Sequence, residues 1–163
     1  MTVTRHGSAT IDLSTECEVK IQRAFEAPMS LVFDALTKPE HVRVWFSADG
    51  VPLDVCEIDL RVGGKYHFAW HAKDVECSFR GTFMEIEPPT RIVRTWVFEG
   101  RPEAEAVETI SLREENGVTT MTDRLVFKDR ASRDANFGGD TQGAQSSFNH
   151  LNDLLQDLLA GRA

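Results

Sequence analysis

The chain has 163 residues, enough for one domain with a substantial core but not for two domains of ordinary size. Its formal net charge is −8 and its Lys and Arg residues are scattered, which argues against nucleic acid or an anionic membrane as a partner. Cysteines at positions 17, 56 and 77 form no Cys-x-x-Cys pair, and the sequence has no apolar leader and no stretch of membrane-spanning length. We expect a cytoplasmic protein with free thiols, in which residues 1–14 are a flexible tail before a single domain at 15–163.

A strand and two short helices are the first elements predicted along the chain. Residues 17–22 (CEVKIQ) alternate between apolar and polar, as in a strand with one buried face. The segment 25–28 (FEAP) ends this strand, and the fixed φ of its proline suits the first turn of a helix. Thr37 and Glu40 stand three positions apart, as a capping box requires, so a second short helix leading to Trp45 is predicted.

Six further strands with short turns between them are predicted next. The strands are 55–60, 65–71, 77–86, 91–98, 105–113 and 119–127, and the turns are Gly63-Gly64, Lys73-Asp74, Pro88-Pro89, Gly100-Arg101-Pro102 and Asn116-Gly117. Connections this short favour an antiparallel meander.

The last segment has the pattern of a long amphipathic helix. Its apolar stripe consists of Ala144, Phe148, Leu151, Leu155 and Leu158, at intervals of three and four residues. Asp140 is well placed as the N-cap of this helix. Such a helix after a curved antiparallel sheet is expected to pack on the concave face, where curvature can leave a cavity.

Several motifs carry a resemblance to a known family. They are F-x-A-P at 25–28, T-x-P-E…W at 37–45, D-L-R-x-G-G at 59–64 and E-P-P-T-R-I-V at 87–93. With the C-terminal helix, they make residues 15–160 resemble the START-like helix-grip (SRPBCC) superfamily, in the branch named after the activator of the 90-kDa heat-shock protein ATPase. The resemblance implies an α+β helix-grip fold, a curved antiparallel meander wrapped around a long C-terminal helix, with two short helices after the first strand. This scaffold serves many functions, so the resemblance does not choose among them.

The Asn116-Gly117 dipeptide fixes how the two strands that it joins are paired. Counting outward from a two-residue hairpin loop places position 110 opposite 123 and position 108 opposite 125. Side-chain alternation then puts Glu108 and Asp123 on the apolar inner face, as diagonal neighbours about 7–8 Å apart at Cα. The sequence therefore predicts two carboxyl groups inside the domain.

These two acids have two interpretations. In the family that the chain resembles, the matching positions are usually apolar, so the acids depart from its pattern. The resemblance also implies a cavity-facing residue near Asp140, which is then the alternative to its role as an N-cap. Glu108 and Asp123 can form the polar end of a ligand cavity, where they would recognise a donor or a cation. Alternatively, Glu108 lies at a solvated rim and a nearby arginine satisfies Asp123, with Arg94 as the candidate.

Aromatic side chains complete the candidate ligand-binding site. An apolar wall with a few polar groups is typical of small-molecule sites, but large aromatic residues are also commonly buried for packing alone. The candidates, with the two acids, are Trp45, Tyr66, Phe68, Trp70, Phe79, Phe83, Trp96 and Phe148.

The sequence contains no signature of a metal site or of a catalytic nucleophile. His67 and His71 are four residues apart on one strand, about 13 Å, and the alternation puts them on the outer face. The sequence has no H-E-x-x-H, Cys/His cluster, G-x-S-x-G or P-loop motif. We therefore expect no metal and no cofactor, and assign no catalytic residue.

Three functions follow as hypotheses. The first is binding of a small hydrophobic or amphiphilic molecule between the sheet and the last helix. The second is an enzyme similar to the superfamily's cyclases and dehydratases of aromatic polyketides, which needs Glu108 and Asp123 as an acid–base pair free of any arginine. The third is a co-chaperone-like interaction with another protein, which the family name suggests, although the eukaryotic activators carry an additional N-terminal domain. A homodimer through a sheet edge or the outer helix face is compatible with the sequence.

Overall fold

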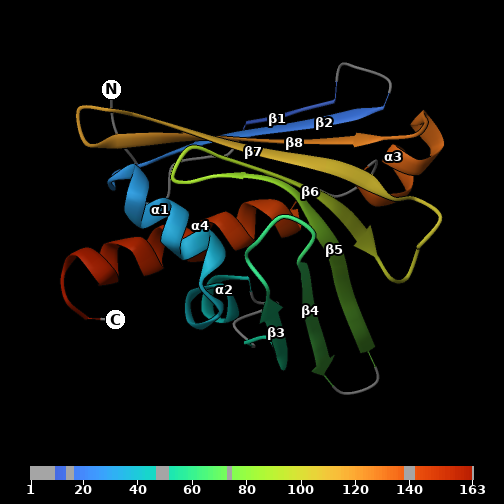
Figure 1. Ribbon diagram of the computed structural model, residues 1–163, viewed down its shortest axis with the longest axis horizontal. Helices are drawn as coiled ribbons and strands as arrows, with labels where there is room; N and C mark the ends of the chain where they lie inside the picture. The colour runs from blue at the N-terminus through green and yellow to red at the C-terminus, as the bar shows by residue number, and fades with distance from the viewer. Residues whose placement is uncertain (1–9, 14–16, 47–51, 73–74, 138–141, 163) are drawn as a thin grey trace.

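The computed structural model describes residues 10–13, 17–46, 52–72, 75–137 and 142–162. Within these residues the chain forms one eight-stranded antiparallel sheet and four helices (Figure 1). In chain order they are β1 (Thr10–Asp12), β2 (Glu18–Phe25), α1 (Met29–Thr37), α2 (Pro39–Trp45), β3 (Val55–Ile58), β4 (Lys65–Ala72), β5 (Val75–Glu87), β6 (Arg91–Phe98), β7 (Ala106–Glu115), β8 (Val118–Phe127), α3 (Arg130–Phe137) and α4 (Gln142–Leu159). None of these helices is both long enough and apolar enough to cross a membrane.

The strands follow the order β1-β2-β8-β7-β6-β5-β4-β3 across the sheet. Strands β3 to β8 form the predicted meander, and β2 pairs with β8 after the chain has passed through α1 and α2. Figure 1 shows the sheet bending around α4, with α1 beside that helix and α3 at the other end. This is the helix-grip arrangement expected from the sequence.

The predicted register of the last hairpin is confirmed. Positions 115 and 118 pair across the turn, followed by 110 with 123 and 108 with 125. Asn116 and Gly117 have φ of 53° and 78°, the left-handed values that a two-residue type I′ turn requires. One dipeptide therefore fixes which side chains of β7 and β8 face α4.

The core lies between the inner face of the sheet and α4. Helix α4 contributes Phe148, Leu151, Leu154 and Leu155, all buried, so the predicted apolar stripe is its packing face. The sheet contributes the alternating inner positions, including Val19 and Met121 at about full burial. Burial of these side chains is the main stabilising contribution that holds the helix to the sheet.

The starts of the helices differ from the sequence predictions. Pro28 precedes α1 as its N-cap and makes no side-chain cap, so the amide of Met29 instead donates to Glu114 Oε1 of β7, at 2.7 Å. The capping box predicted for Thr37 and Glu40 is wrong. Thr37 is the last residue of α1, and its hydroxyl donates to the carbonyl of Phe33.

Two ordered elements were not predicted. Strand β1 lies within the segment expected to be a tail, because Thr10–Asp12 pairs with β2 and Ile11 packs against the core. Helix α3 begins after Asp129, whose carboxylate accepts the amide hydrogen of Ser132 at 2.8 Å, as an N-cap does. The Lys73-Asp74 turn and the possible N-cap Asp140 lie outside the described residues.

Candidate functional site

A charged cluster lies on the inner face of the sheet. Glu108 on β7 and Asp123 on β8 are only 4% and 6% exposed. Arg94 on β6 lies directly opposite Glu108 in the register, and its Nε donates to Glu108 Oε1 at 2.6 Å. Asp123 is the diagonal neighbour of Glu108 across the hairpin, as the sequence predicted. Three neighbouring strands therefore bring two acids and one cation together beneath α4.

Burial and charge set the protonation of the cluster. Burial opposes the charge on Arg94, but the Glu108 carboxylate outweighs it, so the pKa of Arg94 is raised. Burial raises the pKa of Asp123 well above its usual range, and the charge of Glu108 and a hydrogen bond to it act in the same direction. Asp123 thus favours its protonated form, and the cluster consists of one ion pair and one neutral acid.

The aromatic ring of Tyr66, on β4, packs against the guanidinium group of Arg94. The guanidinium carbon lies 4.4 Å from the centre of the Tyr66 ring, a cation–π contact. The Tyr66 hydroxyl donates to the carbonyl of Thr95 at 2.7 Å, and burial raises its pKa. The ring reaches β6 across Gly81, where an added Cβ would lie 2.6 Å from Tyr66 Cε1. A glycine at this position on β5 is therefore what admits the tyrosine.

One acceptor in the cluster has no partner. Asp123 Oδ1 is buried and makes no hydrogen bond. A buried polar atom left without a partner destabilises the fold by about 1–3 kcal/mol. An inner group that can donate a hydrogen bond, from a ligand or a water molecule, would remove this penalty.

The alternative interpretation of the acids is correct only in part. Arg94 is indeed the arginine of the cluster, but it binds Glu108 rather than Asp123. Glu108 does not lie at a solvated rim, because it is the more deeply buried of the two acids. The acid–base pair free of arginine that the enzyme hypothesis requires is therefore not what these side chains form.

The predicted aromatic residues belong to one chain of ring contacts. Phe46, which the sequence analysis missed, lies at its centre, with ring centroids 5.4 Å from Phe68 and Trp70 and 5.7 Å from Phe79. The predicted residues also contact one another directly. These contacts are Trp45 with Phe148, Tyr66 with Phe68 and Phe83, Trp70 with Phe79, and Phe79 with Trp96. The structure therefore brings all eight predicted aromatic side chains together, with Tyr66 linking them to the charged cluster.

Four rings of this set are only half buried, and they contact one another in succession. Phe46, Phe79, Trp96 and Phe137 are of intermediate exposure, whereas most of the others are buried. Phe79 and Trp96 are 5.5 Å apart, and Trp96 and Phe137 are 5.9 Å apart. The sequence signal for Phe46 was available, because it directly follows Trp45 at the end of the second helix.

Arg23 is a second buried cation that the sequence analysis missed. It lies on β2 between Ile21 and Phe25 in the alternation, and it is 2% exposed. Its Nη1 donates to Asn149 Oδ1 of α4 at 2.6 Å, while its Nε and Nη2 have no partner. The apolar residues at 19, 21 and 25 alternate with outward-facing ones, and this alternation already places position 23 on the inner face.

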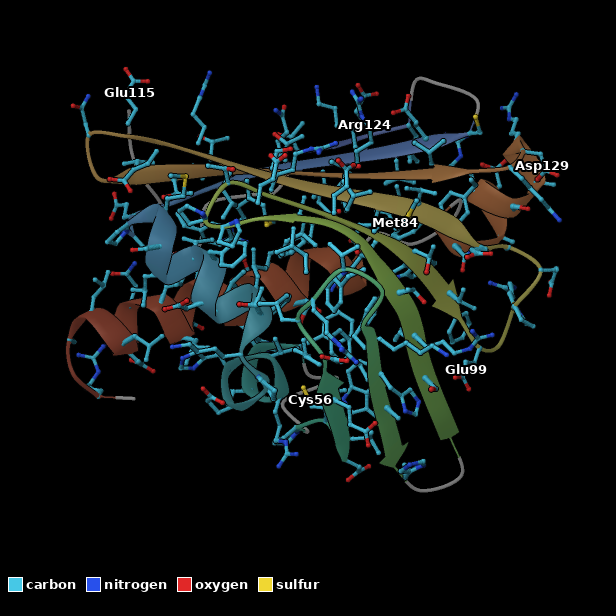
Figure 2. All side chains as sticks on the ribbon, viewed as in Figure 1. Cys56, Met84, Glu99, Glu115, Arg124 and Asp129 are labelled. Atoms are coloured by element: carbon cyan, nitrogen blue, oxygen red, sulfur yellow. The ribbon has the colours of Figure 1, made fainter. Side chains whose placement is uncertain are left out.

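A serine, a histidine and a glutamate meet on the outer face of β4–β6, but without the geometry of a triad. His67 Nε2 lies 2.8 Å from Ser78 Oγ and 3.8 Å from Glu99 Oε1. Glu99, which Figure 2 labels, also pairs with Arg80. A catalytic relay needs the two partners on different ring nitrogens. In the described part of the chain, no group of three His, Cys, Asp or Glu side chains could hold a metal ion.

A depression of about 240 Å³ lies on the outer face of β2, β8 and β7. Its lining residues are Gln22, Ser111, Leu112, Arg113, Thr120 and Thr122. This lining is mostly polar, so it does not match a hydrophobic ligand.

The fold has many solved relatives. A protein of Rhodobacter sphaeroides superimposes with a TM-score of 0.83 at 22% identity, over 92% of this chain and 99% of the other. A protein of Staphylococcus epidermidis superimposes with a TM-score of 0.76 at 26% identity, over 91% of this chain and 94% of the other. A protein of Mycobacterium smegmatis superimposes with a TM-score of 0.77 at 19% identity, over 90% of this chain and 94% of the other. Among curated proteins, none matches this sequence.

An antiparallel sheet that bends around a long C-terminal helix (Figure 1) defines the helix-grip fold, which these solved structures share. Residues 26–156 match the family described as activator of Hsp90 ATPase homolog 1-like protein. The chain belongs to this family, since the match covers most of its length.

Proposed function

We propose that this domain binds a small hydrophobic or amphiphilic molecule between the sheet and α4, with Asp123 as its polar contact. The observation that carries the proposal is the unpartnered, buried Asp123 Oδ1. A ligand that donates a hydrogen bond to this oxygen would satisfy it. This hydrogen bond would favour a ligand with a donor group, because an apolar molecule of the same shape would leave the oxygen unsatisfied.

The aromatic chain supports the apolar part of the proposal. Its half-buried rings, Phe46, Phe79, Trp96 and Phe137, form successive contacts. Tyr66 connects these rings to the charged cluster through Phe68, 5.1 Å away. An apolar wall that leads to a few polar groups is the usual composition of a small-molecule site.

The charge of the cluster favours an uncharged donor over a cation. Arg94 already neutralises Glu108, and the raised pKa of Asp123 favours its neutral form. A ligand ammonium group would also lie close to the guanidinium of Arg94, which would repel it. We therefore infer a hydroxyl or an amide N–H as the ligand group at this end.

Thermal unfolding with a ligand panel tests the proposal. The panel contains flat aromatic, steroid-like and fatty compounds, each with a hydroxyl, with an ammonium group and without either. A ligand at a hundred times its dissociation constant adds about 2.7 kcal/mol to the free energy of unfolding. We expect stabilisation by one skeleton class, strongest for its hydroxyl member.

Variants locate the contact within the protein. Asp123→Leu should abolish the advantage of the hydroxyl over the bare skeleton, whereas Glu115→Leu, which removes an exposed carboxylate from the same hairpin (Figure 2), should retain it. Stabilisation by ammonium compounds alone, or an unchanged hydroxyl preference in Asp123→Leu, would contradict the assignment of Asp123. No stabilisation by any compound would favour the co-chaperone-like role, which binding to a chaperone can test directly.

A further inference from the structure

Arg23 is a buried cation whose hydrogen bonds are only partly satisfied. The side chain is 2% exposed and lies between β2 and α4. Its cross-strand neighbour is the buried Met121, and its guanidinium lies 5.5 Å from the centre of the Phe25 ring. Such surroundings make an unsatisfied guanidinium costly, because they cannot replace the hydrogen bonds of water.

The missing hydrogen bonds lie on one edge of the guanidinium. Asn149 holds Nη1, at 2.6 Å, and so fixes the plane of the group. Nε and Nη2, both without a partner, form the side edge, from which two parallel N–H bonds point the same way. This fork matches the two oxygens of one carboxylate.

Asp153, one helical turn after Asn149, does not fill this edge. Its charge opposes the lowering of the Arg23 pKa that burial causes, so it lies near the guanidinium. It nevertheless accepts no hydrogen bond from Nε or Nη2, and it has an interaction partner of its own. The side edge of Arg23 therefore remains open to a further acceptor.

We propose that the Nε–Nη2 edge of Arg23 binds the carboxylate of a small amphiphilic acid held between β2 and α4. A carboxylate fits better than a phosphate, because α4 places the Asn149 amide oxygen and the Asp153 carboxylate near the guanidinium. Both present acceptor oxygens, which would repel the additional charge of a phosphate. The proposal rests on the proposed function only in placing a ligand in the interior of the domain.

Arg23 and Asp123 give the interior two different polar contacts. Arg23 pairs with Met121 across the strands, and Asp123 is two residues further along β8. The Cα atoms of Arg23 and Asp123 are therefore about 7–8 Å apart. Arg23 reaches α4, however, whereas Asp123 reaches Glu108 on β7. The site at Arg23 can thus be tested independently of the site at Asp123.

Matched acids and alcohols test the proposal on the full chain. Decanoate is compared with 1-decanol, and naphthalene-2-carboxylate with 2-naphthalenemethanol, by calorimetry and by the Nε–H resonance of Arg23 in ¹⁵N-labelled protein. We expect at least one acid to bind about tenfold or more tighter than its alcohol, since two charge-assisted hydrogen bonds are gained. The Arg23 resonance, assigned by its loss in Arg23→Gln, should move as this acid saturates the protein.

In Arg23→Gln, the acid should fall to the affinity of its alcohol while the alcohol is unaffected. Arg124→Gln on the outer face of β8 is the matched control and should change neither (Figure 2). Arg23→Met serves if the glutamine variant does not fold. A purely structural arginine would weaken acid and alcohol equally.

Three results would overturn the proposal. They are equal binding of acid and alcohol to the wild type, an acid preference that survives in both Arg23 variants, and an Arg23 resonance that saturating acid does not move. If the alcohols bind and the acids bind no better, only the carboxylate site fails. If neither class binds, the interior site for such skeletons fails as well.

Discussion

Asp123, Glu108 and Arg94 show how ionisable side chains are accommodated inside this domain. A single buried carboxylate would be strongly destabilising, and two adjacent ones more so. Arg94 binds one of them, and the proton on the other becomes harder to remove. The resulting ion pair and neutral acid have no net charge, which limits the electrostatic penalty of burial.

The raised pKa of Asp123 predicts a pH-dependent stability. Above about pH 4 the unfolded chain releases this proton while the folded protein retains it, so unfolding releases a proton. The contribution of Asp123 to stability therefore falls as pH rises from about 4, by at most about 1.4 kcal/mol per pH unit, until the folded-state pKa is passed. Asp123→Asn removes this dependence, so its stability relative to the wild type should increase with pH in urea unfolding between pH 4.5 and 8.

Asp129 supplies a control of opposite sign. The amide of Ser132 lowers the pKa of this exposed N-cap carboxylate, so its contribution to stability is present above the unfolded pKa and is lost as pH falls through the folded pKa. Asp129→Asn should therefore lose stability relative to the wild type as pH rises through the acidic range. The same trend for both variants would contradict a raised pKa at Asp123.

The Arg94–Glu108 pair should be strongly coupled. Removing one partner leaves the other charge buried and unpaired, so Glu108→Leu and Arg94→Met are each expected to lower the free energy of unfolding by about 3–5 kcal/mol. Arg94→Met/Glu108→Leu should recover most of this loss, because neither charge remains. Urea unfolding of the four proteins gives the coupling energy, and additive losses would show that the two side chains do not act as a pair.

The sequence located the acids but not their partners, for a physical reason. The two-residue Asn116-Gly117 loop fixes the β7–β8 register, so the parity of Glu108 and Asp123 followed directly. The connection between β6 and β7 spans residues 99–105, and a loop of that length leaves the register open. Which acid lies opposite Arg94 therefore depended on tertiary packing.

At the scale of elements, strand and helix positions were largely predictable, whereas helix termini were not. Alternation and turn residues located the strands of the meander within a few residues. The Thr37–Glu40 spacing failed as a capping box because Thr37 still belongs to α1, where its hydroxyl bonds the carbonyl four residues earlier. Spacing alone does not reveal whether the preceding helix has ended.

The Tyr66 ring packs directly against Gly81, so adding a single methyl group at position 81 should strongly destabilise the fold. In Gly81→Ala the new Cβ would collide with the carbonyl oxygen of Thr95 and with the Tyr66 ring, so β5 and β6 would have to separate. We expect a loss of about 1–3 kcal/mol or more from overpacking, measured by urea unfolding. The Arg94 contact with Tyr66 should be disturbed as well.

Gly117→Ala is the comparison for this effect. Its φ of 78° disfavours alanine, but no atom lies within 4 Å of the added Cβ. The expected loss is about 1 kcal/mol, from backbone strain alone. If Gly81→Ala lowers the free energy of unfolding no more than Gly117→Ala does, then β5 and β6 can separate at little energetic cost.

At the scale of the whole molecule, the order of the sheet predicts where it opens first. Strand β8 pairs with β2 and β7 on its two sides, and α4 covers its inner face, whereas β1 (Thr10–Asp12) and β3 (Val55–Ile58) are short edge strands. Amide hydrogen exchange should therefore be slowest in β8 and its neighbours and fastest in β1, with β3 next. Slow exchange in β1 would indicate that something covers that edge, such as a second copy of the chain.

The overall architecture followed from the sequence more readily than the site. Repeated strand patterns and one long apolar stripe define a sheet closed on a helix, and these signals extend over tens of residues. The site instead depends on single side chains, such as Phe46 and Arg23, whose importance comes from neighbours far away in the sequence. Local periodicity places such residues on a face but does not identify their contacts.

The hydrogen bond from the Met29 amide to Glu114 also bears on how the chain avoids misfolding. Apolar alternation excludes a one-residue slip of β7 along β8, because every side chain would change face. It does not exclude a two-residue slip, which preserves the faces. Such a slip would move Glu114 by about 6–7 Å and leave the start of α1 without this acceptor. The long-range cap therefore acts together with the Asn116-Gly117 turn against a misaligned hairpin that the hydrophobic pattern alone would permit.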